Sequence, residues 1–187
     1  MRLGIFGGSF DPPHVGHLLV ATDSVEALRL DRLIFVPAAV QPLKVGQSAA
    51  DARHRLAMVR LLVDDDARFA VDPIEMHREG LSYTVETLAA FADRHPDAER
   101  FFLAGTDVLG SLAQWREPRR VLQLATLAVM QRKGEGGQVP DGAIRVETRR
   151  VDVSSTEIRE RVRKGRTIRG FVPDAVAAYI EAQRLYR

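Results

Sequence analysis

The fold of this 187-residue chain is decided by one stretch near its start, RLGIFGGSFDPPHVGH, residues 2–17. Its first part, Arg2–Phe6, is a short apolar run of the kind that forms a strand buried inside a parallel sheet. The run enters Gly7-Gly8, and apolar residues at helical spacing begin near Val15. We therefore expect a buried strand, a glycine turn and a helix in direct succession, which is how an α/β domain begins.

The rest of the chain continues this alternation. Strands are predicted at 33–36, 101–104, 127–130 and 144–146, with short extended pieces at 68–71 and 74–77. Helices are predicted at 15–30, 51–63, 82–94, 108–112, 118–124, 154–164 and 173–185. Because right-handed crossovers join such strands, the pattern predicts a doubly wound, Rossmann-like parallel sheet with helices on both faces. We expect a single domain over residues 1–187, with a small C-terminal helical part over about 154–187.

Composition excludes several classes of protein. The chain is 45% hydrophobic and 28% charged, which is ordinary for a domain that buries a core. It has no cysteine, which excludes disulfide scaffolds, cysteine-ligated metals and thiol nucleophiles. There is no apolar run of about 18 residues, and the first ten residues lack a signal peptide's apolar stretch. We expect a soluble, cytoplasmic protein with no membrane partner.

Ligands of doubly wound sheets bind beyond the carboxyl ends of the strands, so the first turn is the place to look for chemistry. Gly7 and Gly8 let the backbone come close to a ligand, and the N–H groups of the turn form an anion site with the helix start. His14 and His17 are three residues apart, so they project from the same side of the first helical turn. Both can donate an N–H to phosphoryl oxygens, which makes the stretch a candidate phosphate clamp.

These residues have other possible uses. The stretch is neither G-x-G-x-x-G nor G-x-x-x-x-G-K-[ST], so it matches neither the dinucleotide fingerprint nor the Walker loop. Asp11, His14 and His17 could hold a metal ion, but no further carboxylate or histidine lies nearby in the sequence. We therefore expect no metal bound by the protein itself.

Residues 8–17 read G-x-F-D-P-x-H-x-G-H and resemble the signature of the nucleotidyltransferase superfamily, whose members transfer a nucleotidyl group from a triphosphate. A second element of that superfamily, S-S-T-x-I-R, appears as Ser154–Arg159. It opens a predicted helix within residues 145–169, where nine basic residues stand against four acidic ones. A helix start in a basic segment suits a second phosphate contact.

Other segments are similar to the nicotinate-mononucleotide adenylyltransferase family. That family's loop P-x-x-x-P-P-H-K corresponds to Pro37–Lys44, with Gln41 and Leu43 in place of a proline and the histidine. This chain therefore lacks that histidine, and the resemblance implies Lys44 as the functional residue of the loop. The family's S-Y-T and G-x-D segments, its ring-stacking aromatic and its C-terminal segment correspond to Ser82–Thr84, Gly105–Asp107, Trp115 and 172–186.

The resemblance implies an enzyme of NAD biosynthesis that joins ATP and nicotinate mononucleotide into nicotinate adenine dinucleotide and pyrophosphate. It implies direct in-line attack without a covalent intermediate, with Mg²⁺ carried by the ATP phosphates and no nucleic-acid partner. The residues implied as catalytic are His14, His17, Lys44 and Arg159. Those implied to bind ATP are Gly7, Gly8, Ser9, Phe10, His14, His17, Gly105, Asp107, Ser154, Ser155, Thr156, Ile158 and Arg159. Those implied to bind the acceptor are Ser9, Lys44, Ser82, Tyr83, Thr84, Trp115 and Arg116.

Two alternatives remain open at this point. The chain could be another enzyme of the superfamily, with phosphopantetheine or the amide mononucleotide as acceptor. It could also be a non-catalytic nucleotide sensor or RNA binder that uses the same fold and the basic segment. Pyrophosphate release separates these readings, while a homo-oligomer is compatible with all of them.

Overall fold

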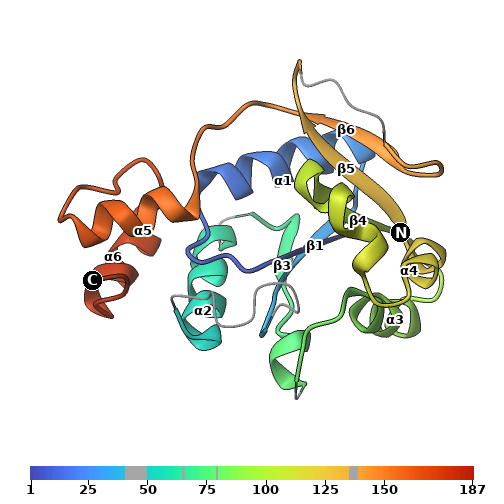
Figure 1. Ribbon diagram of the computed structural model, residues 1–187, viewed down its shortest axis with the longest axis horizontal. Coiled ribbons are helices and arrows are strands. Elements are labelled where there is room, and N and C mark those ends of the chain that lie inside the picture. The colour runs from blue at the N-terminus through green and yellow to red at the C-terminus, as the bar shows by residue number, and fades with distance from the viewer. Residues whose placement is uncertain (41–49, 65, 79, 135–138) are drawn as a thin grey trace.

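The computed structural model describes residues 1–40, 50–64, 66–78, 80–134 and 139–187, and the side chains of residues 107 and 108 also lie outside the description. In chain order its elements are β1 (Arg2–Gly8), α1 (Val15–Leu28), β2 (Arg32–Pro37), α2 (Ala52–Val63), β3 (Phe69–Val71), η2 (Ile74–His77), α3 (Thr84–Arg94), β4 (Glu99–Gly105), η3 (Thr106–Gln114), α4 (Pro118–Leu124), β5 (Thr126–Arg132), β6 (Ile144–Thr148), α5 (Ser155–Arg163) and α6 (Asp174–Ala182). Figure 1 shows them in place.

The six strands form one parallel sheet in the order β3-β2-β1-β4-β5-β6. Helices α1 and α2 pack in the hydrophobic cluster of one face, and α3 and α4 pack in that of the other (Figure 1). The chain turns from one half of the sheet to the other between the neighbouring strands β1 and β4, which is the switch point where such folds bind ligands. The predicted doubly wound, Rossmann-like fold is confirmed.

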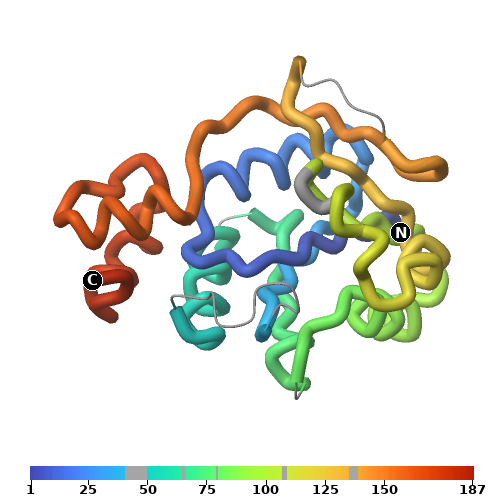
Figure 2. The backbone as a smooth tube through the Cα atoms, viewed as in Figure 1, coloured from blue at the N-terminus to red at the C-terminus, as the bar shows by residue number. Residues whose placement is uncertain are grey.

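The two last helices form a third hydrophobic cluster beside the sheet. Ile158 of α5 and Val176 and Ile180 of α6 are fully buried together with Met58 of α2. Figure 2 shows this C-terminal part at the end of the molecule away from the N-terminus. The Val15 N–H donates to the Phe171 carbonyl oxygen at 3.0 Å, so the same part also fixes the start of α1.

The segment after β3 differs from its prediction. Residues 74–77 were expected to be extended, but they form the 3₁₀ helix η2. The reason is local: Pro73 holds φ at −82°, and the Asp72 carboxylate accepts from the Ile74 N–H at 2.9 Å. A proline and an aspartate that bonds two residues ahead both favour a turn over a strand. The prediction for this segment was therefore wrong.

Within the described ranges, none of the helices is both long and apolar enough to span a bilayer.

Candidate active site

A cavity of about 580 Å³ opens at the carboxyl ends of the central strands, within the size range of ligand sites. Its walls come from the turn after β1, the first turn of α1, the start of α3, the ends of β4 and β5, and residues 149–155. The predicted residues that line it are Gly7, Gly8, Ser9, Phe10, His14, His17, Ser82, Tyr83, Thr84, Gly105, Trp115, Arg116 and Ser155.

The two histidines lie together at the first turn of α1. Their ring centroids are 3.8 Å apart, with the planes inclined by 36°. His17 Nδ1 accepts from the His14 backbone N–H at 3.2 Å. A neutral imidazole that accepts at Nδ1 carries its proton at Nε2. His17 therefore keeps an Nε2–H donor for a ligand in the cavity.

Burial keeps both rings uncharged in the free protein. It lowers the pKa of His14 to about 4. The pKa of His17 is held well below its ordinary value by burial and by the neighbouring His14 ring. His14 Nδ1 is buried, and no described residue gives it a hydrogen bond. A negatively charged ligand would stabilise the protonated rings and oppose this effect of burial.

Gly16 allows the His14 ring to lie where it does. A Cβ atom on Gly16 would come within 2.9 Å of both Cε1 and Nδ1 of that ring. Real Cβ atoms do not approach ring atoms so closely, so any side chain here would displace the imidazole. The glycine between the two histidines is thus a steric requirement of the pair.

The glycine turn that precedes the histidines is held from its inner side by Arg55 of α2, a residue that sequence reasoning missed. Only 1% of Arg55 is exposed. Its guanidinium donates to the carbonyl oxygens of Ser9 at 2.8 Å, Ala38 at 2.6 Å and Ala39 at 2.9 Å. Phe10 takes a left-handed φ of 49°, and its ring meets His17 edge-on at 5.1 Å. A bulky residue is strained in that conformation, so the contacts around it must keep it there.

The C-terminal part holds the next two residues of the turn. Ser155 Oγ donates to the Pro12 carbonyl oxygen at 2.8 Å, and Arg159 donates to the Asp11 carbonyl oxygen at 2.7 Å. The Tyr186 hydroxyl donates to the buried Asp11 carboxylate at 2.7 Å. These bonds bring the start of α5 against the signature turn, although the two are about 140 residues apart in sequence.

The other residues predicted in the S-S-T-x-I-R element make hydrogen bonds and packing contacts within the protein, and their contact with ATP stays a prediction. Ser154 Oγ accepts from the Glu157 N–H at 3.1 Å and caps α5, as its capping pattern predicts. Thr156 accepts from Arg159 at 3.1 Å. Ile158 was predicted to bind ATP, but its side chain is fully buried in the third cluster and its N–H donates to the Ser154 carbonyl oxygen. None of Ser154, Thr156, Ile158 and Arg159 lines the cavity.

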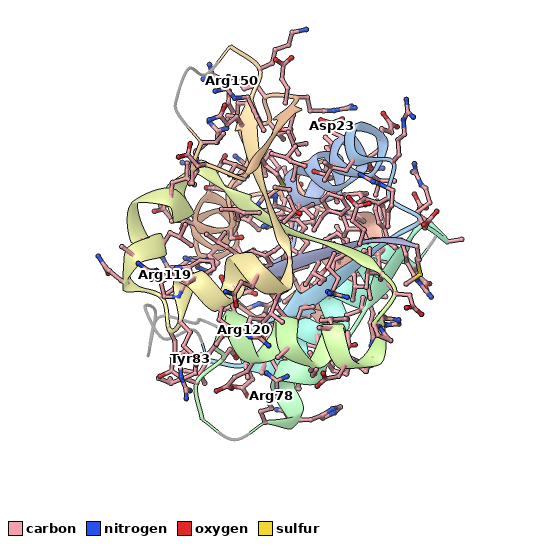
Figure 3. The ribbon with its side chains drawn as sticks, turned by 90° about the vertical axis from the view of Figure 1, so that its right-hand side faces the viewer. Asp23, Arg78, Tyr83, Arg119, Arg120 and Arg150 are labelled. Carbon is pink, nitrogen blue, oxygen red and sulfur yellow. The ribbon has the colours of Figure 1, made fainter. Side chains whose placement is uncertain are left out.

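The opposite end of the cavity has an aromatic and cationic wall. Trp115 meets Phe102 edge-to-face at 5.8 Å. Arg116 lies 4.8 Å over the Tyr83 ring and pairs with Glu86 at 2.7 Å. Tyr83, labelled in Figure 3, is the residue before α3, and its side chain does not cap the helix. The Tyr83 side chain therefore accepts from none of the N–H groups that begin α3, and a helix start of this kind favours a bound anion.

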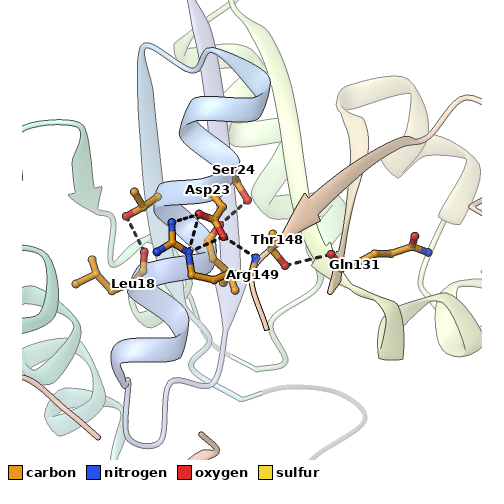
Figure 4. Close-up of polar contacts among 8 residues, drawn as sticks. Leu18, Asp23, Ser24, Gln131, Thr148 and Arg149 are labelled. Carbon is orange, nitrogen blue, oxygen red and sulfur yellow. Dashed lines mark hydrogen bonds and ion pairs between the residues drawn. The ribbon is translucent and has the colours of Figure 1, made fainter. Parts of the chain in front are cut away.

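Several further cavity residues were not predicted as site residues. Glu75 and Thr87 lie at the α3 end, and Arg132 and Arg149 lie at the ends of β5 and β6. The Arg149 guanidinium donates to the Asp23 carboxylate at 2.9 Å through Nε and lowers the pKa of that carboxyl (Figure 4). Arg149 belongs to the basic segment noted in the sequence, which could have marked it.

Two predicted site residues cannot be compared with the structure at the side-chain level. Lys44 lies outside the described residues, as do Gln41 and Leu43, the two departures from the family's loop. Asp107 lies in η3, but its side chain is outside the description.

Comparison with known proteins identifies the family of this chain. Residues 5–161 match the cytidylyltransferase-like family. A probable nicotinate-nucleotide adenylyltransferase from Gemmatimonas aurantiaca is 52% identical and covers 100% of this chain and 93% of its own length. One from Thermus thermophilus is 44% identical, with 100% of both chains covered. The fold is shared with a Plasmodium falciparum nicotinic acid mononucleotide adenylyltransferase solved with NaAD, at a TM-score of 0.79, 17% identity and coverage of 99% and 97%.

Proposed function

Because the chain belongs to the nicotinate-nucleotide adenylyltransferases of the cytidylyltransferase-like family, we propose that its cavity joins ATP and nicotinate mononucleotide into nicotinate adenine dinucleotide and pyrophosphate. The observation that carries this proposal is the pair of imidazoles, 3.8 Å apart, that lines the cavity beside the glycine turn. These groups supply N–H donors at the place where a triphosphate would meet the start of α1.

The reaction needs no protein base. An oxygen of the mononucleotide's phosphate forms a bond to the α-phosphorus of ATP, and the bond from that phosphorus to the bridging oxygen breaks in line. The electron pair leaves with pyrophosphate. Because the attacking phosphate is already anionic, catalysis consists of bringing two polyanions together and stabilising the charge that develops.

The residues of the signature turn supply that stabilisation. His17 Nε2–H, His14 and the N–H groups of 8–10 donate to the α- and β-phosphates. Ser155 contributes from the start of α5, where the helix dipole also favours phosphate. Arg159 positions the turn through Asp11, and its positive charge adds to the field around the triphosphate. Lys44 is proposed as a second cation on the strength of the family pattern.

The α3 end of the cavity is proposed to hold the nicotinate ring. The face of Trp115 can stack on a pyridine ring, which contributes about 1 kcal/mol. The ring's carboxylate can then accept from the N–H groups that begin α3, because Tyr83 does not cap them. A neutral amide gains less from that helix start, so the site is expected to prefer the acid to the amide.

Mg²⁺ is proposed to enter as the partner of the ATP phosphates. Among the residues that the structure describes, no three histidine, aspartate or glutamate side chains gather closely enough to hold a metal ion. Phosphate oxygens and water are the ligands Mg²⁺ ordinarily takes in such sites. The ion's chemistry would be to neutralise charge on the leaving pyrophosphate.

A pyrophosphate-release assay with ATP and three separate acceptors tests the function. We expect release with nicotinate mononucleotide, slower release with the amide mononucleotide, and none with phosphopantetheine. Mass spectrometry should identify nicotinate adenine dinucleotide as the product. Release with phosphopantetheine alone would assign a different acceptor, and ATP binding without release would favour a nucleotide sensor.

A further inference from the structure

One buried charged side chain in the cavity has no part in the mechanism above. Of the described residues that line the cavity, Glu75 alone is acidic, and it is 8% exposed. Its carboxylate accepts from Thr87 Oγ1 at 2.7 Å, and it is also hydrogen-bonded to the Ser82 hydroxyl. A negatively charged carboxylate repels two polyanionic substrates. Its presence in their site therefore calls for a contribution that offsets this repulsion.

The Ser82 hydroxyl shows what that is. A hydrogen bond with this hydroxyl lowers the pKa of Glu75. The hydroxyl oxygen accepts from the backbone N–H groups of Ala39, at 3.1 Å, and Val40, at 3.4 Å. The Ser82 N–H in turn donates to the Val40 carbonyl oxygen at 2.8 Å. Glu75 therefore fixes the orientation of a hydroxyl that joins the segment before α3 to the segment after β2.

The segment after β2 is held on its other side by Arg55. The same guanidinium that donates to Ala38 and Ala39 also donates to Ser9 in the signature turn. A continuous series of hydrogen bonds thus runs from Glu75 through Ser82 and residues 38–40 to Arg55 and Ser9. It connects the proposed acceptor end of the cavity with the phosphate end.

We propose that Glu75 is a positioning residue for the acceptor, because it fixes Ser82, Tyr83 and Thr84 against residues 38–40 at the wall that receives the mononucleotide. The inference rests on the proposed function and deepens it. It predicts that loss of the carboxylate weakens acceptor binding and leaves ATP binding and the chemical step unchanged.

The groups around Glu75 give the proposal a pH dependence. Burial raises the pKa of Glu75, the hydrogen bonds from Thr87 and Ser82 and the nearby Arg78 lower it, and Glu86 raises it, with burial the largest effect. Arg78 also donates to Thr87 Oγ1 at 3.3 Å, and the side-chain view labels it (Figure 3). As pH falls, Glu75 takes up a proton before an ordinary glutamate would, and it then loses the negative charge that strengthens the hydrogen bonds from both hydroxyls.

The test compares Glu75→Gln with the wild type in steady-state assays of nicotinate adenine dinucleotide formation. We expect the KM for nicotinate mononucleotide to rise about tenfold, the order of effect that a broken buried hydrogen bond produces. The KM for ATP and kcat should stay within about twofold. Glu99→Gln, which alters an exposed ion pair with Arg2 at the amino edge of the sheet, is the matched control and should change none of the three.

Two further measurements separate positioning from a general structural role. The ratio of acceptor KM between Glu75→Gln and wild type should fall toward one as pH is lowered, because the amide resembles the protonated carboxyl. Ser82→Ala should raise the acceptor KM by itself, and adding it to Glu75→Gln should give less than the product of the two effects. If Glu75→Gln fails to fold, Ser82→Ala alone tests the inference. Its KM for nicotinate mononucleotide should rise while its KM for ATP stays unchanged.

An unchanged acceptor KM in Glu75→Gln, or equal rises in the KM of both substrates, would overturn the inference. So would a pH-independent ratio or fully multiplicative effects. A wild-type protein that forms no nicotinate adenine dinucleotide would instead overturn the proposed function.

Discussion

Burial of His14 makes the free protein unusually sensitive to acid, and lowering the pH is the perturbation that shows it. The folded chain holds the pKa of His14 at about 4, against an ordinary value of 6.5. Below pH 6.5, His14 of the unfolded chain therefore binds a proton, whereas the buried ring of the folded chain stays neutral until the pH approaches 4. The stability that His14 contributes is complete above pH 6.5 and is lost progressively as pH falls toward 4.

The size of the loss follows from the difference of about 2.5 pKa units, taken at 1.36 kcal/mol each. It amounts to about 3 kcal/mol, and most of it has occurred by pH 4.5. Solvent screening does not reduce it much, because only 7% of His14 is exposed. A loss of this size is a large fraction of the stability of an ordinary domain.

Urea unfolding of the wild type and His14→Asn at pH 7.5 and pH 4.5 measures this loss. Carboxylates titrate over the same range in both proteins, so the difference between the two pH-dependent losses reports the part that depends on His14, including its effect on the pKa of the neighbouring His17. The wild type should lose about 2–3 kcal/mol more than the variant. His77→Asn, at an exposed histidine, should behave like the wild type. Equal losses in wild type and His14→Asn would refute the argument that the ring is buried and neutral.

Three substitutions test other contacts of the site. Trp115→Ala should raise the KM for nicotinate mononucleotide about fivefold, as loss of a ring contact predicts, and an unchanged acceptor KM would refute stacking. Gly16→Ala should lower kcat at least tenfold, because its Cβ would displace the His14 ring. Gly110→Ala is the control and should leave kcat unchanged, because its Cβ would meet nothing within 4 Å. Equal kcat values in the two variants would contradict the steric role of Gly16. Tyr186→Phe removes the bond to Asp11 and should lower the Tm by about 3–6 °C in a thermal scan, and an unchanged Tm would show that the bond contributes nothing.

The sequence could predict the parts of the site that are encoded locally. The strand, glycine turn and first helical turn are consecutive, so the juxtaposition of His14 and His17 follows from their spacing alone. The cap of α5 by Ser154 is equally local, since donor and acceptor are three residues apart. The order of elements likewise indicated the doubly wound sheet, because parallel strands joined by helices have few other arrangements.

The sequence could not predict buried charges whose partners come from distant segments. Arg55 falls on the same helical face as Met58, Val59 and Leu62, and that spacing alone could have shown that it points inward. Its role could not be seen, because its acceptors lie near residues 9 and 38. Glu75 gave no signal at all, since its burial depends on a 3₁₀ turn that was predicted as extended chain.

We propose that the imidazole pair supplies hydrogen bonds to the transferred phosphoryl group, and the turnover number of His17→Ala measures that contribution. With both substrates saturating, kcat should fall about 10²-fold or more, as for the loss of one transition-state donor. The KM for nicotinate mononucleotide should change far less. Turnover close to that of the wild type would contradict the claim.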